Sequence, residues 1–156
     1  RRTDGVLVQR RLQPVGIMFS EFYFYLAGFI VPKEKEKLKF EIENDPFPTI
    51  YRIDRINSFT VTETHFAVPY SKRFEEGEFR KRIQFMYGGH LQRLRFLFKG
   101  GSYEYILDRL PTAKVVAEGE NGTLIEAEVF GKGIDIWLKS QGELIEVISR
   151  QEIPVN

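Results

Sequence analysis

The chain carries Tyr-Arg-Ile-Asp-Arg-Ile at residues 51–56, and this hexapeptide is the main signal for the fold of the first half of the sequence. Two arginines and an aspartate are interspersed there with apolar and aromatic residues, which is typical of a β-strand. A second strand is predicted over residues 22–29, where five of eight residues are aromatic. Its apolar residues do not alternate with polar ones, so we expect both of its faces to be covered. A cation-bearing strand beside an aromatic strand suits an anionic or planar ligand.

Length and composition indicate a soluble globular protein of one large or two small domains. The chain has 156 residues, of which 42% are hydrophobic and 29% charged. No apolar run approaches the roughly 20 residues that a membrane helix needs, and no signal-peptide pattern is present. We therefore expect a cytoplasmic protein without membrane contact. Because residue 1 is Arg1, we also expect a fragment or a processed chain, with any DNA-binding domain lying before it.

The sequence offers little for covalent or metal chemistry. Cysteine is absent, which removes disulfides, thiolate catalysis and Cys-based zinc sites and fits a reducing compartment. The two histidines, His65 and His90, lie far apart and belong to no recognisable catalytic or ligand motif. Glu126 and Glu128 alternate on what we expect to be an exposed strand face. We therefore predict no catalytic residues, no metal site, no cofactor and no enzymatic activity.

Charge is distributed unevenly along the chain. Residues 77–99 hold six Lys and Arg against one acidic residue, whereas residues 100–156 hold five against ten. Residues 1–76 are nearly balanced, so the total is only +1. The basic and acidic segments indicate complementary packing or a contact between two copies of the chain; a surface that faces nucleic acid is the other interpretation.

Short strands separated by turn signals predict an all-β module over residues 1–68, an SH3-like or Sm-like barrel. The predicted strands are residues 6–12, stopped by Pro14 and Gly16; 22–29, ended by Pro32; 50–56; and 59–64. Residues 33–39 read as a solvated loop, and Phe40 and Ile42 as the start of a return strand. Within residues 69–89, apolar spacing over 78–87 predicts a linker helix with Arg80, Lys81 and Arg82 turned mostly outward.

Residues 90–156 predict a β-α-β-β-α-β succession, the ferredoxin-like pattern of an α+β domain. Residues 93–98 alternate as a strand, and Ser102 to Pro111 bound a helix. Asn121-Gly122 indicates a hairpin turn between the next two strands. Gly142 ends a second helix that contains Trp137, and residues 144–148 form the last strand. The whole chain is therefore predicted to be mostly β in its first part and α+β in its second.

Several motifs, taken together and in order, resemble the WYL domain of bacterial transcriptional regulators and the C-terminal extension that often follows it. Phe24-Tyr25-Leu26 is similar to the naming motif, with Phe in place of Trp. Residues 13–17 resemble the family's His-Pro-Tyr-Gly-Leu turn, with Gln13 for His and Val15 for Tyr. Residues 51–56 resemble its Phe-Arg-Leu-Asp-Arg-Ile strand. In the extension, residues 109–111, 126–131 and 137–138 are also similar.

The resemblance implies a ligand-sensing module that controls an attached effector, in most members an N-terminal winged helix-turn-helix. WYL domains are Sm-like barrels thought to bind nucleic-acid ligands such as short single strands. The implied partner is therefore short single-stranded DNA or RNA, or a nucleotide. Duplex DNA would be bound only through the missing N-terminal domain. By the family match, the ligand-binding residues are Arg52 and Arg55, with Tyr25 and Gln13 as secondary candidates.

Each candidate residue also has a purely structural interpretation. Side chains of a regular strand alternate between faces, so Arg52 and Arg55 reach one ligand only if the strand ends or bulges between them. Otherwise one arginine pairs with Asp54 or another acid. Tyr25 has the pattern of a core residue, and Gln13 could merely satisfy backbone groups beside its Pro turn.

The leading hypothesis is thus a regulatory module that binds a short nucleic-acid ligand. The alternatives are a dimerisation module, in which the acidic lobe docks a basic helix of a second copy, and an RNA-binding accessory of a defence system. Ligand sensing and a homodimer are compatible, and we expect both.

Overall fold

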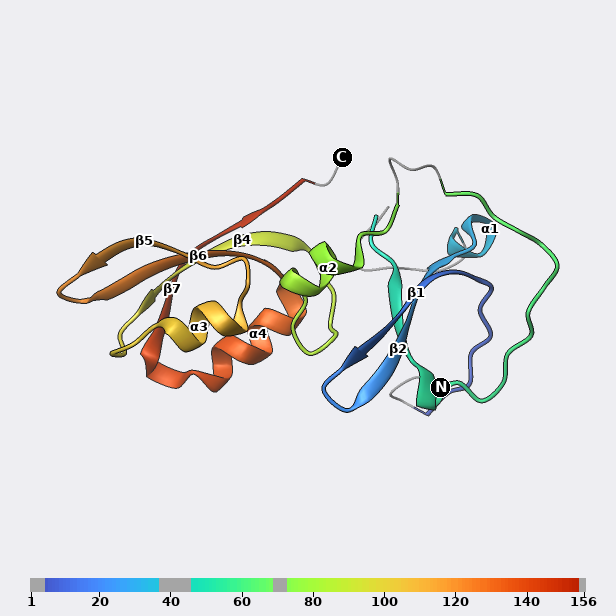
Figure 1. The fold of residues 1–156 in the computed structure, drawn as a ribbon, viewed down its shortest axis with the longest axis horizontal. Helices are drawn as coiled ribbons and strands as arrows, with labels where there is room; N and C mark the ends of the chain where they lie inside the picture. The colour runs from blue at the N-terminus through green and yellow to red at the C-terminus, as the bar shows by residue number, and fades with distance from the viewer. Residues whose placement is uncertain (1–4, 37–45, 69–72, 155–156) are drawn as a thin grey trace. The chain divides into compact units, whose positions relative to one another are not determined.

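The computed structural model describes residues 5–36, 46–68 and 73–154 (Figure 1). The chain divides into two compact units, Arg1–Glu76 and Gly77–Asn156. Each unit contains one antiparallel sheet, of three and four strands respectively, and the fold is mixed α+β. Among the described residues, no helix is long and apolar enough to cross a membrane.

The sheet of the first unit has the order β1-β2-β3, with β1 at Leu12–Ser20, β2 at Tyr23–Ile30 and β3 at Thr49–Arg52. A tight turn joins β1 to β2, and Glu21 adopts a positive φ of 55° there. The strands described for this unit form an open sheet and do not close into a barrel.

The first strand differs from the sequence-based prediction. Residues 6–11 are not a strand, and Pro14 and Gly16 lie inside β1 instead of stopping it. The β1–β2 register shifts between these two residues, which marks a bulge. β1 is an edge strand, so the N–H that Pro14 lacks is not needed for a second ladder, and the bulge absorbs the irregularity.

The aromatic strand β2 is not covered on both faces along its whole length. Ala27 and Ile30 in its second half are buried, but Phe24 near the hairpin tip is 58% exposed. Phe22, in the turn itself, is 84% exposed. The expectation of full coverage is therefore wrong at the tip, where the ring of Phe24 contacts that of Phe19 but stays largely exposed.

The strand predicted over residues 50–56 ends early, at Arg52, and Ile53–Arg55 form the 3₁₀ turn η1. The Ile56 N–H closes this turn by donating to the Ile53 carbonyl at 3.0 Å. No strand forms over residues 59–64, and Phe59 and Val61 there are more than 80% exposed. β-Propensity is realised only against a pairing partner, and the described strands supply none to this segment.

The charged run after β2 begins as the short helix α1, Pro32–Lys35, where the sequence predicts a solvated loop. Pro32 does follow the end of β2 at Ile30, as expected. The return strand expected at Phe40 and Ile42 falls on residues 37–45, which lie outside the described residues.

Helix α2 spans Glu76–Arg82, so the helix predicted over 78–87 ends five residues early. Phe85 and Met86 adopt positive φ angles of 52° and 54°, which no right-handed helix accommodates. An isolated bridge between Gln84 and Tyr87 closes the resulting turn. All of α2 after its first residue belongs to the second unit, where the ring of Phe79 lies 5.2 Å from that of Phe130.

The second unit follows the predicted β-α-β-β-α-β succession. Its sheet has the order β5-β6-β4-β7, with every neighbouring pair antiparallel. The predicted hairpin between these strands is confirmed, but its two loop residues are Glu120 and Asn121, because Gly122 pairs with Gly119 and begins β6. The elements are β4 Leu91–Phe98, α3 Glu104–Arg109, β5 Lys114–Gly119, β6 Gly122–Phe130, α4 Gly131–Ser140, the 3₁₀ turn η3 Gly142–Leu144 and β7 Ile145–Glu152.

Helices α3 and α4 lie together on one side of this sheet (Figure 1). Alternate residues of β4 and β6 point toward them and are almost fully buried, as the alternation in the sequence predicts. The sheet thus has one apolar face under the helices and one opposite face that carries the charged residues. The core consists of Leu94, Phe96, Phe98, Ile106, Leu110, Ile125, Ala127, Val129, Ile134, Trp137 and Leu138.

We predict that Gly133→Ala destabilises the second unit. Gly133 is buried in the first turn of α4, and an added Cβ would overlap the backbone carbonyl of Gln84. Overpacking of this kind costs about 1–3 kcal/mol of unfolding free energy. Urea unfolding followed by the fluorescence of Trp137, the single tryptophan, measures the loss. Gly101→Ala is the control, since nothing lies within 4 Å of its Cβ position. Equal stability of the two variants would contradict the packing described.

Candidate functional site

Three of the four residues expected to bind ligand lie together in the first unit. Tyr25 on β2 is the direct register partner of Arg52 on β3. Directly opposed residues of an antiparallel pair project from the same face of a sheet. The Tyr25 ring and the Arg52 guanidinium therefore share one face.

Arg55 joins this pair because β3 ends between the two arginines. In a continued strand, Arg55 would point to the face opposite Arg52. The turn η1 removes that alternation, and the charges of both arginines act on the Tyr25 hydroxyl. The structure thus meets the condition that the sequence left open, an interruption of the strand between Arg52 and Arg55.

Arg52 has two partners of its own. Its Nε donates to Asp54 Oδ1 at 3.0 Å and its Nη2 to Oδ2 at 2.5 Å, which is a bidentate fork on one carboxylate. The guanidinium carbon also lies 3.5 Å from the centroid of the Tyr23 ring, a cation–π contact. The hydrogen bonds from Arg52 hold the pKa of the Asp54 carboxyl below its ordinary value.

The surroundings of Tyr25 are electrostatically balanced. Burial raises the pKa of the Tyr25 hydroxyl above its ordinary value, and Arg52 and Arg55 oppose that shift. Glu21 and Asp54 raise the same pKa by charge repulsion. The two cations and two carboxylates that act on this hydroxyl sum to zero charge, and Arg52 is held in place by Asp54.

Gln13 is not part of this cluster. Its register partner is Phe29, four residues beyond Tyr25 on β2. At about 3.4 Å per residue, this separates Gln13 from Tyr25 by roughly 13 Å along the strands. Gln13 is half-buried beside the β1 bulge. Its alternative role, hydrogen bonding to backbone groups near Pro14, therefore stays a prediction.

The arrangement can bind an anion that is attached to a planar group. Arg52 and Arg55 supply cations, and Tyr23 and Tyr25 supply rings next to them. The sequence interpretation named Asp54 only as an alternative partner for one arginine, and it missed Tyr23. Tyr23 precedes Tyr25 by two residues on one strand. Because residues two apart in a strand lie on the same face, this spacing could have identified Tyr23 as a neighbour of Tyr25 from the sequence.

The second unit carries a separate cluster of charges on the sheet face opposite its helices. Glu126, expected to be solvated, has a side chain only 7% exposed. Arg95 Nε donates to it at 2.6 Å, Lys114 Nζ lies 3.0 Å away and Arg93 Nε 3.8 Å. Register explains the burial, because Arg95 and Lys114 are the direct partners of Glu126 on the two neighbouring strands. We call Glu126 with these three cations the Glu126 cluster.

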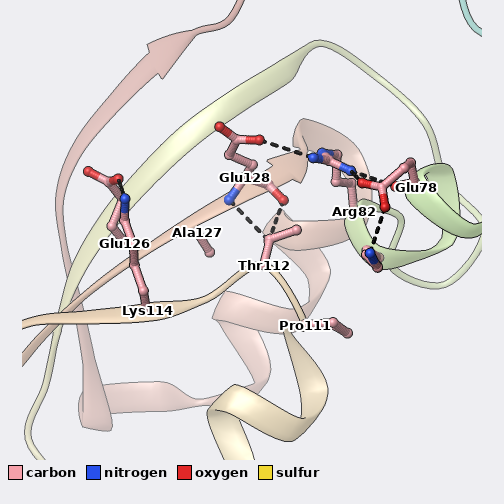
Figure 2. Close-up of a pocket in the computed structure, with 9 residues that line it drawn as sticks. Glu78, Arg82, Pro111, Thr112, Lys114, Glu126, Ala127 and Glu128 are labelled. Atoms are coloured by element: carbon pink, nitrogen blue, oxygen red, sulfur yellow. Dashed lines mark hydrogen bonds and ion pairs between the residues drawn. The ribbon is translucent and has the colours of Figure 1, made fainter.

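A hollow of about 290 Å³ lies between this cluster and α2 (Figure 2). The Thr112 hydroxyl donates to the Glu128 carbonyl at 2.7 Å and accepts from its N–H at 3.1 Å, so one side chain satisfies both backbone groups of Glu128. Arg82 connects α2 to the sheet by donating to Glu78 at 2.8 Å and to Glu128 at 3.3 Å. Arg82 is thus half-buried, not part of a solvated helix face as predicted.

These contacts pair the basic segment with the acidic segment inside one unit. Arg82 and Arg93 contact Glu128, Arg95 contacts Glu126, and Lys99 contacts Glu146 at 2.7 Å. The charge asymmetry along the sequence is therefore accounted for, in large part, by complementary packing.

In the described parts of the chain, no group of three or more His, Asp or Glu residues could hold a metal ion. No model of a known protein family matches the chain, and no curated protein matches it either.

We predict that Glu126 makes stability depend on pH. Hydrogen bonds from Arg95 and Lys114 hold its pKa below the ordinary value of about 4.3. A depressed carboxyl pKa contributes stability that is present above the ordinary pKa and is lost as pH falls through the folded-state pKa. Glu126→Gln should therefore destabilise the protein by about 1–2 kcal/mol at pH 6 and by less at pH 3.

Urea unfolding of wild type and variant at both pH values measures this difference. Glu143→Gln, which removes the same charge from an exposed position in η3, is the control and should change little at either pH. A destabilisation by Glu126→Gln that is equal at pH 6 and pH 3 would show that the carboxylate charge is not what matters.

Proposed function

We propose that the first unit binds a short single-stranded nucleic acid or a related nucleotide, and that the chain is the ligand-sensing part of a bacterial WYL-type transcriptional regulator. The observation that carries the proposal is the shared face of Tyr25 and Arg52, with Arg55 brought in by η1. The motif resemblance over residues 13–17, 24–26 and 51–56 supports it from the sequence.

Asp54 already occupies the position that a ligand phosphate would take. A carboxylate and a phosphate both accept the planar Arg fork through two oxygens. In the free protein Asp54 fills this role for Arg52, and its side chain is 51% exposed. A phosphate that displaces Asp54 finds the guanidinium already held against Tyr23, so little side-chain entropy is lost on binding.

The aromatic residues explain why the ligand would carry bases. Single strands bind by stacking on aromatic faces next to a positive groove, at about 1–3 kcal/mol per base. Tyr23 is 40% exposed and lies beside Arg52, which suits one such stacking contact. A bare phosphate would use the cations alone and should bind more weakly than a nucleotide.

The finer architecture is part of the same proposal. The sheet order β5-β6-β4-β7, with one helix after β4 and one after β6, supports a ferredoxin-like assignment for the second unit. The antiparallel order β1-β2-β3 is compatible with part of an SH3- or Sm-like barrel. Control of an attached DNA-binding domain is the role that the resemblance implies for both units.

We predict that Arg52→Gln weakens binding of a fluorescein-labelled five-nucleotide single strand by about tenfold to a hundredfold. The charge-assisted hydrogen bonds that it removes are worth about 1.5–3 kcal/mol. Asp54→Asn should strengthen binding, because it frees the Arg52 fork and leaves the cluster with a net positive charge. Fluorescence anisotropy at several salt concentrations measures both effects.

Lys33→Gln is the matched control. It removes one positive charge from an exposed residue on α1, which follows the end of β2 opposite the Tyr23 end. This variant should bind like wild type. Equal affinity of wild type and Arg52→Gln, with both proteins folded, would refute the site.

Assembly into a homodimer is the second candidate, and one observation favours it. Phe19, Phe22 and Phe24 at the β1–β2 hairpin are 49%, 84% and 58% exposed, and such grouped apolar side chains mark interaction surfaces. We predict that light scattering finds a dimer that Phe22→Ser together with Phe24→Ser converts to a monomer. A wild type that stays monomeric at high concentration would exclude this role.

A further inference from the structure

We propose that the Glu126 cluster of the second unit is a second, sequence-independent binding surface for the phosphodiester backbone of a single-stranded nucleic acid. It lies on the face of the four-stranded sheet that the helices leave uncovered, and it is independent of the site on the first unit. Three cations surround a single buried carboxylate, and one of them, Arg93, also contacts the half-buried Glu128 at 3.4 Å. The net charge is therefore +2 for the cluster itself and +1 when Glu128 is counted with it.

The charges are layered by depth. The Glu126 side chain is 7% exposed, whereas those of Arg95 and Lys114 are 50% and 69% exposed. A ligand that approaches the sheet therefore meets the cations first. The carboxylate lies beneath them and fixes their positions, which lowers the entropy that they lose when a ligand binds.

The cations keep donors for a ligand. Arg95 contacts Glu126 through Nε only, so within the described structure its two terminal nitrogens donate to no protein atom. Lys114 uses its ammonium for one contact, at 3.0 Å. An Arg fork of this kind matches the oxygens of a phosphate.

Position in the sheet favours a nucleic acid over an acidic peptide. An extended peptide gains affinity chiefly by pairing its backbone with a sheet edge. Arg93 and Arg95 lie on β4, an interior strand between β6 and β7, and only Lys114 lies on an edge strand, at the first residue of β5. A phosphodiester backbone needs only spaced cations, and these two residues are about 6.7 Å apart along the strand.

An apolar shelf continues the same face. Leu97 and Leu124 are register partners on β4 and β6, each two residues beyond a member of the cluster. Both side chains are half-buried and offer a surface for a base or a sugar next to the cations. The shelf has no aromatic ring, so we expect weak discrimination between bases.

The test uses the full chain with Arg52→Gln and Arg55→Gln, which removes the cations of the first site. Binding of a fluorescein-labelled twelve-nucleotide oligothymidylate is measured against salt concentration by fluorescence anisotropy. Adding Arg95→Gln and Lys114→Gln should weaken the remaining binding about tenfold. The slope of log affinity against log salt should become shallower by about 1.4, since each phosphate contact of a single strand contributes about 0.7.

Arg150→Gln with Lys139→Gln is the matched control. It removes the same two charges from the same unit, on the helix-covered side of the sheet, where Arg150 contacts Asp135 and Lys139 belongs to α4. This control should bind like its parent. An unchanged affinity and slope after Arg95→Gln and Lys114→Gln would overturn the inference, whatever the first-site variants do. A decaglutamate peptide that competes as well as the oligonucleotide would overturn the assignment to nucleic acid.

A second measurement uses the unmodified chain and does not depend on how the variants fold. Acetylation of lysines, read by mass spectrometry, should slow at Lys114 in the presence of the oligothymidylate and remain unchanged at the exposed Lys139. Equal reaction of Lys114 with and without the oligonucleotide would also overturn the inference. Loss of all binding in the Arg52→Gln, Arg55→Gln parent would agree with the proposed site on the first unit and would contradict the second binding surface.

Discussion

The end of β3 at Arg52 is the constraint on which the candidate site depends. Three residues of 3₁₀ turn replace the strand there, and a single hydrogen bond from Ile56 to Ile53 closes that turn. A strand continued to Ile56 would separate Arg52 and Arg55 onto opposite faces. The interruption instead lets both charges act on Tyr25 and leaves Asp54 within reach of the Arg52 fork. A local change of backbone conformation thus converts a structural strand into a cluster of functional groups.

Both charged clusters have carboxylates that hold cations in place. In the first unit Asp54 orients Arg52 against Tyr23, and in the second unit Glu126 orients Arg95 and Lys114. The two carboxylates differ in burial, at 51% and 7% exposed. Under the proposed function, the exposed carboxylate is the one that a ligand phosphate would displace, whereas the buried one would stay beneath its cations. The first cluster is therefore suited to selective binding and the second to electrostatic attraction.

The sequence predicts the second unit well and the first unit only in part. Each element from β4 to β7 has its own local signals, such as the alternation in β4 and the Asn121-Gly122 hairpin. In the first unit, Pro14 is tolerated because β1 is an edge with a bulge, which depends on its neighbour. Likewise, the motif pattern brought attention to Arg52, Arg55 and Tyr25, but the end of β3 is a tertiary property. The burial of Glu126 follows from cross-strand register, which the alternating pattern of one strand does not reveal.

The central claim, that Tyr25 and Arg52 act together on one ligand, is tested most directly by nuclear magnetic resonance. Arginine and tyrosine are labelled isotopically, and a five-nucleotide single strand is titrated into the full chain. The account predicts that the Arg52 Nε–Hε signal and the Tyr25 ring signals shift together and saturate at the same ligand concentration. Saturable binding that leaves both sets of signals unchanged would contradict the account.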